Sequence, residues 1–339
     1  MPRVITATAP CRADLAGGTM DIWPLYLFHP GAVTVNFALT TLTRCAVTSL
    51  PGKGIHLRSL DTGKEDRFAS LDALLRARRY QHPLAAHLVR FFRPRSGFRL
   101  ETDSASPAEA GISGSSALMI ATSAALARFT GQRIGREALR VLAQNVEAQL
   151  IGVPTGCQDY YPALYGGVSA IHLDADGIHR RALPVPAAQL DARFLLAYTG
   201  APRQSGINNW EVFKNHLNGD RRVFRNFEEI AGIARAMRDA LAARDWDSAA
   251  RLLAAEWKLR KTNAPGISTP LIERLIAVAR RHGARAAKVC GAGGGGCVLF
   301  LVDPEARSRV AAALADHGGV VLPARVARHG LRVSERHKT

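Results

Sequence analysis

The sequence lacks an apolar run long enough to cross a membrane. The longest candidate, residues 117–127, is followed by Arg128, whereas a membrane helix needs about 18 apolar residues or more. The first residues also lack the long apolar segment of a secretory signal. We therefore expect a cytoplasmic protein without a membrane partner.

Cysteine is scarce, and its spacing fits neither disulfides nor zinc. The chain has five cysteines, an odd number, and none forms a CxxC pair: Cys11, Cys45, Cys157, Cys290 and Cys297. Disulfide frameworks and zinc sites need paired or closely spaced cysteines. We expect reduced thiols.

Aromatic residues are also few, at 6% of the chain. This bears on the meaning of the net charge of +17, which by itself suggests a nucleic-acid partner. The basic residues are mostly arginines, scattered as at residues 76–79 and 93–95, and they are not interleaved with aromatic side chains as in many nucleic-acid binders. We expect a solvated, arginine-rich surface and no specific nucleic-acid partner. Attraction of small anions, or binding of RNA, is the alternative that this charge leaves open.

What the chain does have is enough hydrophobic sequence for one large or two ordinary domains: 47% of 339 residues. The pattern predicts strands at residues 33–39, 44–50, 167–173 and 194–198, helices at 117–130, 137–151, within 224–261, at 270–282 and 304–317, and a strand–loop–strand unit at 285–302. Strands and helices without a regular βαβ alternation predict an α+β fold. The proline turn at 184–186 places a boundary near 190, with domains at 1–190 and 191–339.

The most informative segment is a Gly/Ser loop, here called the anion loop (residues 111–117). It consists of Gly111, Ile112, Ser113, Gly114, Ser115, Ser116 and Ala117, and it opens the apolar helix. Free backbone N–H groups and the positive end of the helix dipole meet at such a turn, which makes it a site for an anion such as phosphate. The serine hydroxyls beside it can reach a metal ion that the anion carries.

A second loop, the glycine loop (residues 291–296), satisfies G-x-G-x-x-G. It leads into the strand-like residues 297–302, whereas a dinucleotide-binding fingerprint needs a helix there. The chain also contains no Walker loop with its lysine. The glycine loop therefore indicates either a tight hairpin or a close approach of backbone to another group.

Three polar positions have both a chemical and a structural interpretation. Glu147 lies at the edge of an apolar helical stripe, where it either meets a cation or faces solvent. Asp159 follows a Gly/Pro-rich turn and is either a reactive carboxylate or an Asx-turn residue. The N-terminal motif (residues 10–21) places Arg12 and two acids around a double glycine, which suits a polyhydroxylated substrate or a locally hydrogen-bonded loop.

Together these segments resemble one enzyme family. The N-terminal motif, residues 107–117 and the glycine loop are similar, in order and spacing, to the three motifs of the GHMP kinase superfamily, which includes galactokinase and the homoserine, mevalonate and phosphomevalonate kinases. The resemblance covers essentially the whole chain. Residues 10–12, 17–21 and 156–160 are most similar to the sugar-1-kinase branch, which includes D-glycero-D-manno-heptose 7-phosphate kinase and the fucokinases.

The resemblance implies a two-domain fold, with an N-terminal part like domain 2 of ribosomal protein S5 and a ferredoxin-like C-terminal part. It implies that Asp159 is the catalytic base and that Arg12 holds the nucleophilic oxygen. It further implies ATP and Mg²⁺ as cofactors, with the anion loop residues Gly111, Ile112, Ser113, Gly114, Ser115, Ser116 and Ala117 on the nucleotide. Ser115 and Glu147 would be the metal ligands, with Ser116 as a neighbouring candidate, and Gly18, Thr19, Asp21, Gly293 and Gly294 would be at the substrate.

The chain departs from the family pattern in the anion loop. The family has glycine where this chain has Ser113 and serine where it has Gly114, so the left-handed residue of the loop is free to move by one position. Cys157 stands where relatives often carry lysine, and Met20 is unusual in a polar loop.

We therefore expect a Mg-ATP-dependent kinase that phosphorylates a sugar or sugar phosphate at the anomeric hydroxyl, as a monomer or homodimer. One alternative is a GHMP kinase for another small alcohol. The other is a non-catalytic protein that senses a sugar or nucleotide on the same fold.

Overall fold

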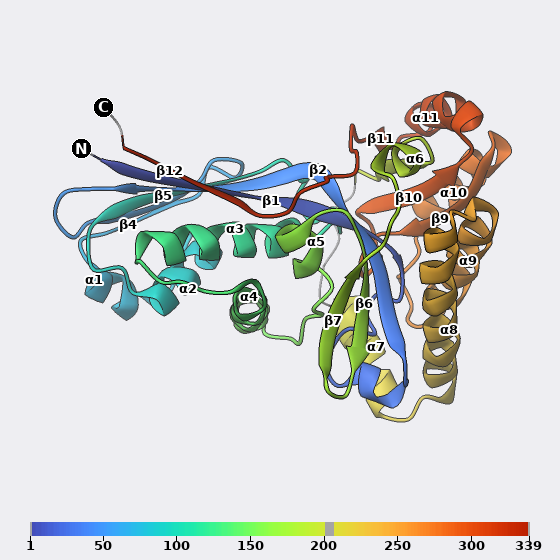
Figure 1. Cartoon of the computed structure of the whole chain (residues 1–339), viewed down its shortest axis with the longest axis horizontal. Helices are drawn as coiled ribbons and strands as arrows, with labels where there is room; N and C mark the ends of the chain where they lie inside the picture. The colour runs from blue at the N-terminus through green and yellow to red at the C-terminus, as the bar shows by residue number, and fades with distance from the viewer. Residues whose placement is uncertain (1, 201–206, 338–339) are drawn as a thin grey trace.

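The structure, a computed structural model, describes residues 2–200 and 207–337. Its large sheet contains β1 (Arg3–Ala16), β2 (Ala32–Ser49), β3 (Ile55–Ser59), β4 (Glu65–Phe68), β5 (Phe98–Ser104), β6 (Val168–Asp174), β7 (Gly177–Ala182) and β12 (Arg332–His337). The strand order is β12-β1-β2-β5-β3-β4, and β6 and β7 branch from β2. The helices of this part are η1 (Leu25–Phe28), α1 (Leu71–Arg76), α2 (Pro83–Phe92), α3 (Gly114–Phe129), α4 (Arg136–Ile151), α5 (Tyr160–Tyr165) and α6 (Ala187–Asp191). Figure 1 shows α2, α3 and α4 on one side of the large sheet.

The second sheet lies at the other end of the molecule (Figure 1) and has the order β11-β8-β10-β9. Its strands are β8 (Phe194–Tyr198), β9 (Ala284–Val289), β10 (Cys297–Val302) and β11 (Val320–Val321), and its helices are α7 (Ile207–Leu217), α8 (Arg221–Ala243), α9 (Trp246–Arg260), α10 (Pro270–Arg281), η2 (Pro304–Ala306) and α11 (Arg307–Asp316). In chain order this is strand, helices, two strands, helix, strand, which is the ferredoxin-like arrangement. The expected α+β class and the ferredoxin-like C-terminal part are confirmed.

The strands predicted at 33–39 and 44–50 form one continuous strand, β2. Residues 40–42 contain no glycine or proline to break it, and Leu42 and Thr43 keep their pairing with β1. Its partner β1 has register irregularities between Pro10 and Arg12 and between Asp14 and Ala16. A β-bulge changes the direction of nearby side chains, and two polar residues of the N-terminal motif, Arg12 and Asp14, lie at these irregularities.

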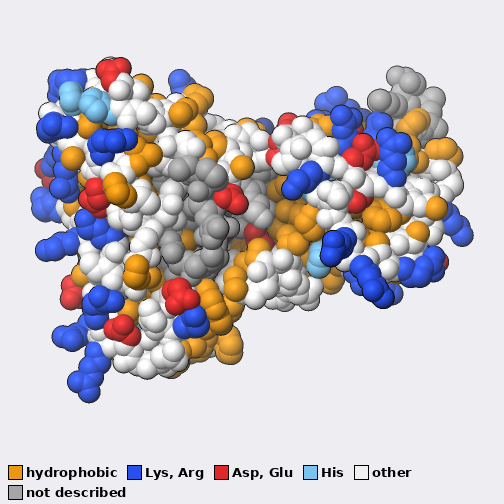
Figure 2. All heavy atoms as spheres, turned by 180° about the vertical axis from the view of Figure 1, so that it is seen from behind, with side chains coloured by type: hydrophobic (Ala, Val, Ile, Leu, Met, Phe, Trp, Pro, Cys, Tyr) orange, Lys and Arg blue, Asp and Glu red, His pale blue; other side chains and the backbone are white. Residues whose placement is uncertain are grey.

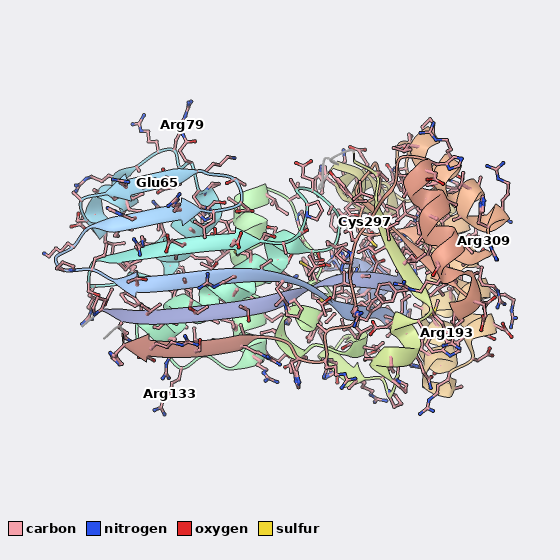
Figure 3. All side chains as sticks on the ribbon, turned by 90° about the horizontal axis from the view of Figure 1, so that it is seen from above. Glu65, Arg79, Arg133, Arg193, Cys297 and Arg309 are labelled. Atoms are coloured by element: carbon pink, nitrogen blue, oxygen red, sulfur yellow. The ribbon has the colours of Figure 1, made fainter. Side chains whose placement is uncertain are left out.

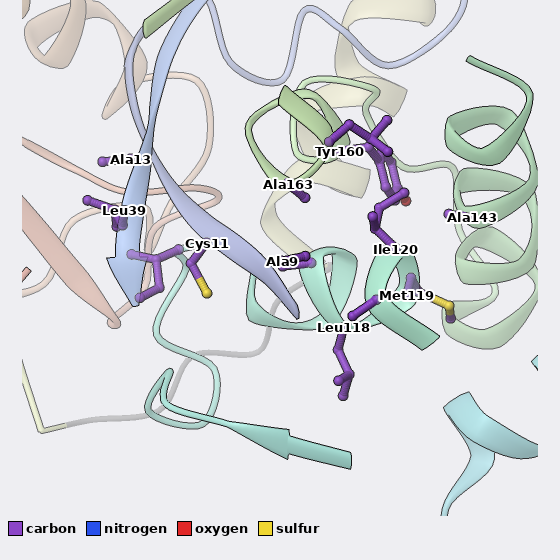
Figure 4. Close-up of a cluster of buried hydrophobic side chains, with 14 of the residues drawn as sticks. Ala9, Cys11, Ala13, Leu39, Leu118, Met119, Ile120, Ala143, Tyr160 and Ala163 are labelled. Atoms are coloured by element: carbon purple, nitrogen blue, oxygen red, sulfur yellow. The ribbon is translucent and has the colours of Figure 1, made fainter. Parts of the chain in front are cut away.

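Helix α3 is apolar on nearly every side because it lies in the centre of the N-terminal part. It packs on β1 and β2 and against α4. Figure 4 shows Leu118, Met119 and Ile120 near Ala9 of β1 and Tyr160 of α5. A helix buried on all faces needs no polar stripe. The run at 117–127 is therefore core rather than membrane sequence, and among the helices of described residues none is long and apolar enough to cross a membrane.

The helical stretch expected within 224–261 is two helices. Arg244 ends α8 in the left-handed region, and the Asp245 carboxylate then accepts the Ser248 N–H as the N-cap of α9. Such a cap starts a new helix in a new direction. By contrast, Thr269 caps α10 and Pro270 opens it, as the sequence predicts.

The last strand returns to the first sheet. β12 pairs antiparallel with β1, from Arg3 opposite His337 to Thr8 opposite Arg332. Strand β12 thus packs with the N-terminal part, although its residue numbers fall in the predicted C-terminal domain, 191–339. The division of the chain near residue 190 stays a prediction.

Basic side chains are spread over the surface. Figure 2 shows Lys and Arg side chains at both ends of one face, with acidic side chains interspersed among them. In Figure 3, Arg79, Arg133 and Arg309 point outward from different edges of the molecule. This distribution agrees with the solvated surface that the sequence predicts.

Candidate active site

One cavity of about 430 Å³ lies where the N-terminal motif, the anion loop and the turn before α5 meet. It is lined by most of the predicted site residues: Arg12, Gly18, Thr19, Asp21, Gly111, Ser113, Gly114, Ser115, Ser116, Glu147 and Asp159. Ile112 and Ala117 are fully buried behind it. Segments that are far apart in the sequence therefore converge on one hollow, as the resemblance implies.

The anion loop has two residues in the left-handed region, Gly111 and Ser113. Ser113 has a φ of 62° and precedes the first residue of α3, and no side chain caps the helix. A Cβ added to Gly114 would lie 2.9 Å from the Cβ of Ser106, so this position needs glycine for space rather than for its φ. A left-handed position of the loop thus falls on a serine, and the uncapped N–H groups of the helix are available to an anion.

The glycine loop supports the anion loop from behind. The Cys297 N–H donates to the Ala110 carbonyl oxygen over 2.7 Å, and Gly296 has no room for a side chain because a Cβ would lie 2.7 Å from that oxygen. Cys297 lies inside the molecule in Figure 3. The hairpin between β9 and β10 thus fixes the backbone just before Gly111.

The two glycines predicted at the substrate, Gly293 and Gly294, lie farther back. Gly293 packs against the Ile267 backbone, and the Gly294 N–H donates to the Ile267 carbonyl oxygen over 2.9 Å. Only Gly291 of this loop is among the residues that line the cavity. Their role at the substrate stays a prediction.

Arg12 and Asp159 form a close ion pair at the cavity. The Arg12 Nη2 lies 2.7 Å from the Asp159 Oδ1, and its Nη1 donates to the Gly111 carbonyl oxygen over 2.8 Å. The Arg12 side chain is 3% exposed and that of Asp159 is 23% exposed. Burial alone would lower the pKa of Arg12, but Asp159 and Asp14 more than offset it and hold that pKa above its usual range. Arg12 therefore stays charged and joins the carboxylate to the anion loop.

Asp21 is a buried carboxyl group beside this pair. It accepts the Gln158 N–H over 2.8 Å, and Gly156 approaches it so closely that no side chain would fit there. Burial, followed by the negative charge of Asp159, raises the pKa of Asp21 to about 7. Near neutral pH it is able to donate as well as accept hydrogen bonds, which suits a hydroxylated ligand.

Glu147 lies with hydroxyl groups at the start of α3. Its Oε2 accepts the Tyr160 hydroxyl over 2.6 Å, and the Ser115 and Ser116 hydroxyls also hydrogen-bond to it. Burial raises the pKa of Glu147 although these hydroxyls favour its charged form. One carboxylate and two serine hydroxyls are oxygen donors of the kind that Mg²⁺ takes. No group of three or more His, Cys, Asp or Glu side chains in the described part of the chain is arranged for a metal, so these donors fit an ion that is also held by a ligand's oxygens.

Sequence reasoning missed the residues that hold the Gly18–Thr19 turn. The Arg260 Nη2 donates to the Gly18 carbonyl oxygen over 2.8 Å, and its Nη1 to the Thr19 hydroxyl over 3.1 Å. Thr19 in turn donates to the Asn209 side chain over 3.0 Å. Arg260 and Asn209 both line the cavity but come from α9 and α7, so no local pattern connects them with residue 18.

A buried charge cluster at the wall of the cavity was not predicted either; Asp14 and Arg260 line the cavity, and Lys288 and Glu256 lie outside its lining. Lys288, on β9, is 0% exposed and donates to Asp14 over 2.5 Å and to Glu256 over 3.1 Å. Glu256, also 0% exposed, pairs with Arg260. The one available signal was Lys288 itself, because residues 284–289 are apolar apart from this lysine and Arg285, and a buried lysine needs a partner.

The cavity is also lined by polar residues that the sequence analysis did not single out: Ser59, Asp61, Thr62, Lys64, Gln81, His82, Ser104 and Ser106. They come from the β3–β4 turn, the start of α2 and the segment after β5. No motif marks them because they are ordinary polar residues in turns and at strand ends.

Comparisons with known proteins agree with this geometry. The model of the GHMP kinases N terminal domain matches residues 78–167, and that of the GHMP kinases C terminal matches residues 237–320. A protein of Campylobacter jejuni named D-glycero-alpha-D-manno-heptose 7-phosphate kinase is 26% identical over 97% of this chain and 98% of its own. A mevalonate kinase of Thermococcus onnurineus is 26% identical over 71% of this chain and 70% of its own.

Solved structures share the fold. A D-glycero-D-manno-heptose 1-phosphate kinase from Bacteriodes thetaiotaomicron superposes with a TM-score of 0.79 at 22% identity, covering 98% of this chain and 100% of its own. A galactokinase of Lactococcus lactis in complex with galactose gives 0.81 at 19% identity, covering 97% and 95%. With both of the family's domain models on the chain, the protein belongs to the GHMP kinases and is an ATP-dependent kinase.

Proposed function

We propose that this kinase transfers the γ-phosphoryl group of ATP to the anomeric hydroxyl of a sugar phosphate, with a heptose 7-phosphate as the first candidate. The observation that carries the proposal is the Arg12–Asp159 pair, which lies in one cavity with the anion loop. The full-length relative named heptose 7-phosphate kinase supports the choice of acceptor.

Asp159 is the proposed base. Its carboxylate takes the proton from the sugar hydroxyl while that oxygen bonds to the γ-phosphorus, and the bond from the γ-phosphorus to its bridging oxygen breaks to release ADP. Arg12 lies within 2.7 Å of the Asp159 carboxylate, so its positive charge lies where negative charge develops on the attacking oxygen. In this way the pair orients the nucleophile and stabilises its charge.

The anion loop would hold the β- and γ-phosphates through the uncapped N–H groups at the start of α3. Glu147 and Ser115, with Ser116 beside them, would hold Mg²⁺. When bound, the ion neutralises charge on the phosphate oxygens. The buried Tyr160 hydroxyl keeps the Glu147 carboxylate directed toward the serines.

The acceptor would lie on the side of Thr19, Asp21, Gln158 and Asn209, which line the cavity with hydroxyl, carboxyl and amide groups. Such groups recognise a substrate with several hydroxyls, because a buried polar group that is left unpaired costs binding energy. This lining favours a sugar over a small alcohol with a single polar end.

The test is a screen of ADP release with heptose 7-phosphate, fucose, galactose, mannose and mevalonate, in which ³¹P and ¹H NMR locate the new phosphate. We expect the highest kcat/KM with the heptose phosphate and a phosphate on its anomeric oxygen. If mevalonate were the preferred acceptor, the proposed sugar substrate would be wrong and the protein would be a kinase for another small alcohol. ATP binding without ADP release from any acceptor would indicate a sensor instead, and salt-sensitive binding of RNA without an effect of ATP would indicate a nucleic-acid partner.

A further inference from the structure

Asp14 lines the cavity between two cations, and it is neither the proposed base nor part of the anion loop. Its Oδ2 accepts from the Lys288 Nζ over 2.5 Å, while its Oδ1 is 3.4 Å from the Arg12 Nη1. The Asp14 and Lys288 side chains are 1% and 0% exposed. Burial would raise the pKa of Asp14, but Lys288 and then Arg12 reverse this and hold it below the usual range. Asp14 is therefore a buried negative charge that needs a cation.

Asp14 and Asp159 are both within reach of the same guanidinium group. Arg12 makes its short contact with Asp159, at 2.7 Å, and its longer one with Asp14, at 3.4 Å. Because Lys288 neutralises Asp14, Arg12 is available to pair with the Asp159 carboxylate. Without Lys288, Asp14 would draw Arg12 away from Asp159, because an unpaired charge is strongly unfavourable in a buried site.

The rest of the charge cluster holds Lys288 in place. Its Nζ also donates to Glu256 over 3.1 Å, and Glu256 pairs with Arg260, which binds Gly18 and Thr19. Positive and negative groups alternate along this chain of contacts, from Asp159 to the Gly18–Thr19 turn. The cluster joins the C-terminal strand β9 and helix α9 to the N-terminal motif.

We infer that Lys288 is a positioning residue for phosphoryl transfer: by neutralising Asp14 it keeps Arg12 directed at Asp159. The inference rests on the proposed function in so far as it concerns turnover. It concerns a residue that contacts neither reactant, since Lys288 is not among the residues lining the cavity.

The first variant to test is Lys288→Met, with the acceptor that gives the highest wild-type turnover. We expect kcat to fall by about 100-fold, the loss typical of a small misplacement in an active site, and the KM for ATP to stay close to its wild-type value. Arg285→Met is the matched control. It removes a positive charge from the same strand, but Arg285 is exposed and pairs with Asp247 and Asp303. It should leave kcat unchanged.

The second variant separates charge from packing. The double variant Asp14→Asn with Lys288→Met removes both the carboxylate that competes for Arg12 and its cation, so it should recover most of the lost kcat. Asp14→Asn alone should cost less kcat than Lys288→Met. A double variant no more active than Lys288→Met, or a Lys288→Met enzyme with wild-type kcat, would overturn the inference.

A crystal structure of Lys288→Met tests the inference without an acceptor. We expect Arg12 to be bonded to Asp14 rather than to Asp159, and an unchanged Arg12–Asp159 contact would overturn the inference. Should Lys288→Met fail to fold, the structure and kcat of Asp14→Asn decide: the Arg12–Asp159 contact and most of the activity should persist. If the wild-type protein releases no ADP with any acceptor, the proposed function fails, while the position of Arg12 still tests the role of Lys288.

Discussion

At the scale of single residues, Ser113 occupies backbone that suits glycine. Its φ is 62°, and its buried hydroxyl has no hydrogen-bond partner among the described residues. Left-handed backbone costs an L-residue about 1–2 kcal/mol, which a glycine would not lose. Glycine also has more conformational freedom in the unfolded chain, and this offsets about half of the gain in stability. We expect Ser113→Gly to raise the free energy of unfolding by about 0.5–1 kcal/mol with an unchanged KM for ATP.

Urea denaturation of the Ser113→Gly variant checks this, with Gly114→Ala beside it. The added Cβ of Gly114→Ala would meet Ser106 at 2.9 Å, so this variant should be less stable than the wild type. A loss of stability in Ser113→Gly would show that the serine is favoured for a reason other than backbone conformation.

Asp159 is the residue on which turnover should depend most. Asp159→Asn removes the proton acceptor and should lower kcat by about 10²–10⁴-fold. ATP affinity, measured by calorimetry, should stay near the wild-type value because the anion loop is unaltered. Asp176→Asn is the control, since Asp176 is an exposed carboxylate in the β6–β7 turn. Turnover above about a tenth of the wild-type rate would exclude Asp159 as the base.

Asp21 should make stability fall as the pH rises. Its pKa is about 7 in the fold and about 3.9 in an unfolded chain. Between these values the folded state binds the extra proton, so the free energy of unfolding decreases with pH, by up to about 1.4 kcal/mol per unit. Asp21→Asn removes this dependence and should gain stability relative to the wild type from pH 4 to 7. Urea midpoints across this range test it, and a difference that does not change with pH would contradict it.

At the scale of elements, the β9–β10 hairpin acts on the site through its backbone. Gly296→Ala would place a Cβ 2.7 Å from the Ala110 carbonyl oxygen and so push the anion loop out of place. We expect the KM for ATP to rise by about tenfold, the equivalent of about 1.4 kcal/mol of lost binding. Gly131→Ala is the matched control, because Gly131 also has a positive φ, +73°, and has nothing within 4 Å of an added Cβ.

ADP release at varied ATP concentrations measures both variants. Gly131→Ala should lower the thermal midpoint and leave KM unaltered. Equal KM values for the two variants would mean that the hairpin does not brace the anion loop.

Local patterns indicated much of the cavity's lining, although Gly293 and Gly294 of the contiguous glycine loop lie outside it. The anion loop, Arg12, Glu147 and Asp159 each stand in a recognisable segment, and the structure brings all of them to one cavity. Lys288, Glu256 and Arg260 lie in no recognisable motif. Their role depends on ion pairs with one another and with Asp14, which only the folded chain brings together. Likewise, the break between α8 and α9 depends on the left-handed backbone of Arg244 and the Asp245 cap. The helical spacing of apolar residues continues across both helices and therefore does not show this break.

At the scale of the whole molecule, β12, the last strand of the described residues, is the edge strand of the large sheet beside β1. Arg3 and Arg128 both pair with Glu335 at 2.6 Å, but exposed ion pairs contribute only about 0–1 kcal/mol. The backbone pairing of β12 and the cover it gives to the β1 edge contribute more, since a bare edge strand invites pairing with another chain.

A chain that ends at residue 330 should therefore be markedly less stable than the wild type and should self-associate. Thermal unfolding and light scattering measure this. Glu335→Gln, which keeps the strand and weakens only its ion pairs, should shift the free energy of unfolding by about 1 kcal/mol or less. A truncated chain as stable and as monodisperse as the Glu335→Gln variant would show that β12 is dispensable.

The position of β12 also sets the order of events during synthesis. Arg3 and its partner Glu335 are 332 residues apart, and the two strands run side by side in the finished molecule (Figure 1). A ribosome that makes this chain releases β1 long before β12, so this edge of the nascent sheet stays open until residues 332–337 have been synthesised. Contacts this distant in sequence form slowly and leave intermediates prone to aggregation. Expression should then depend on chaperones that cover a strand edge more than on the stability of the folded kinase.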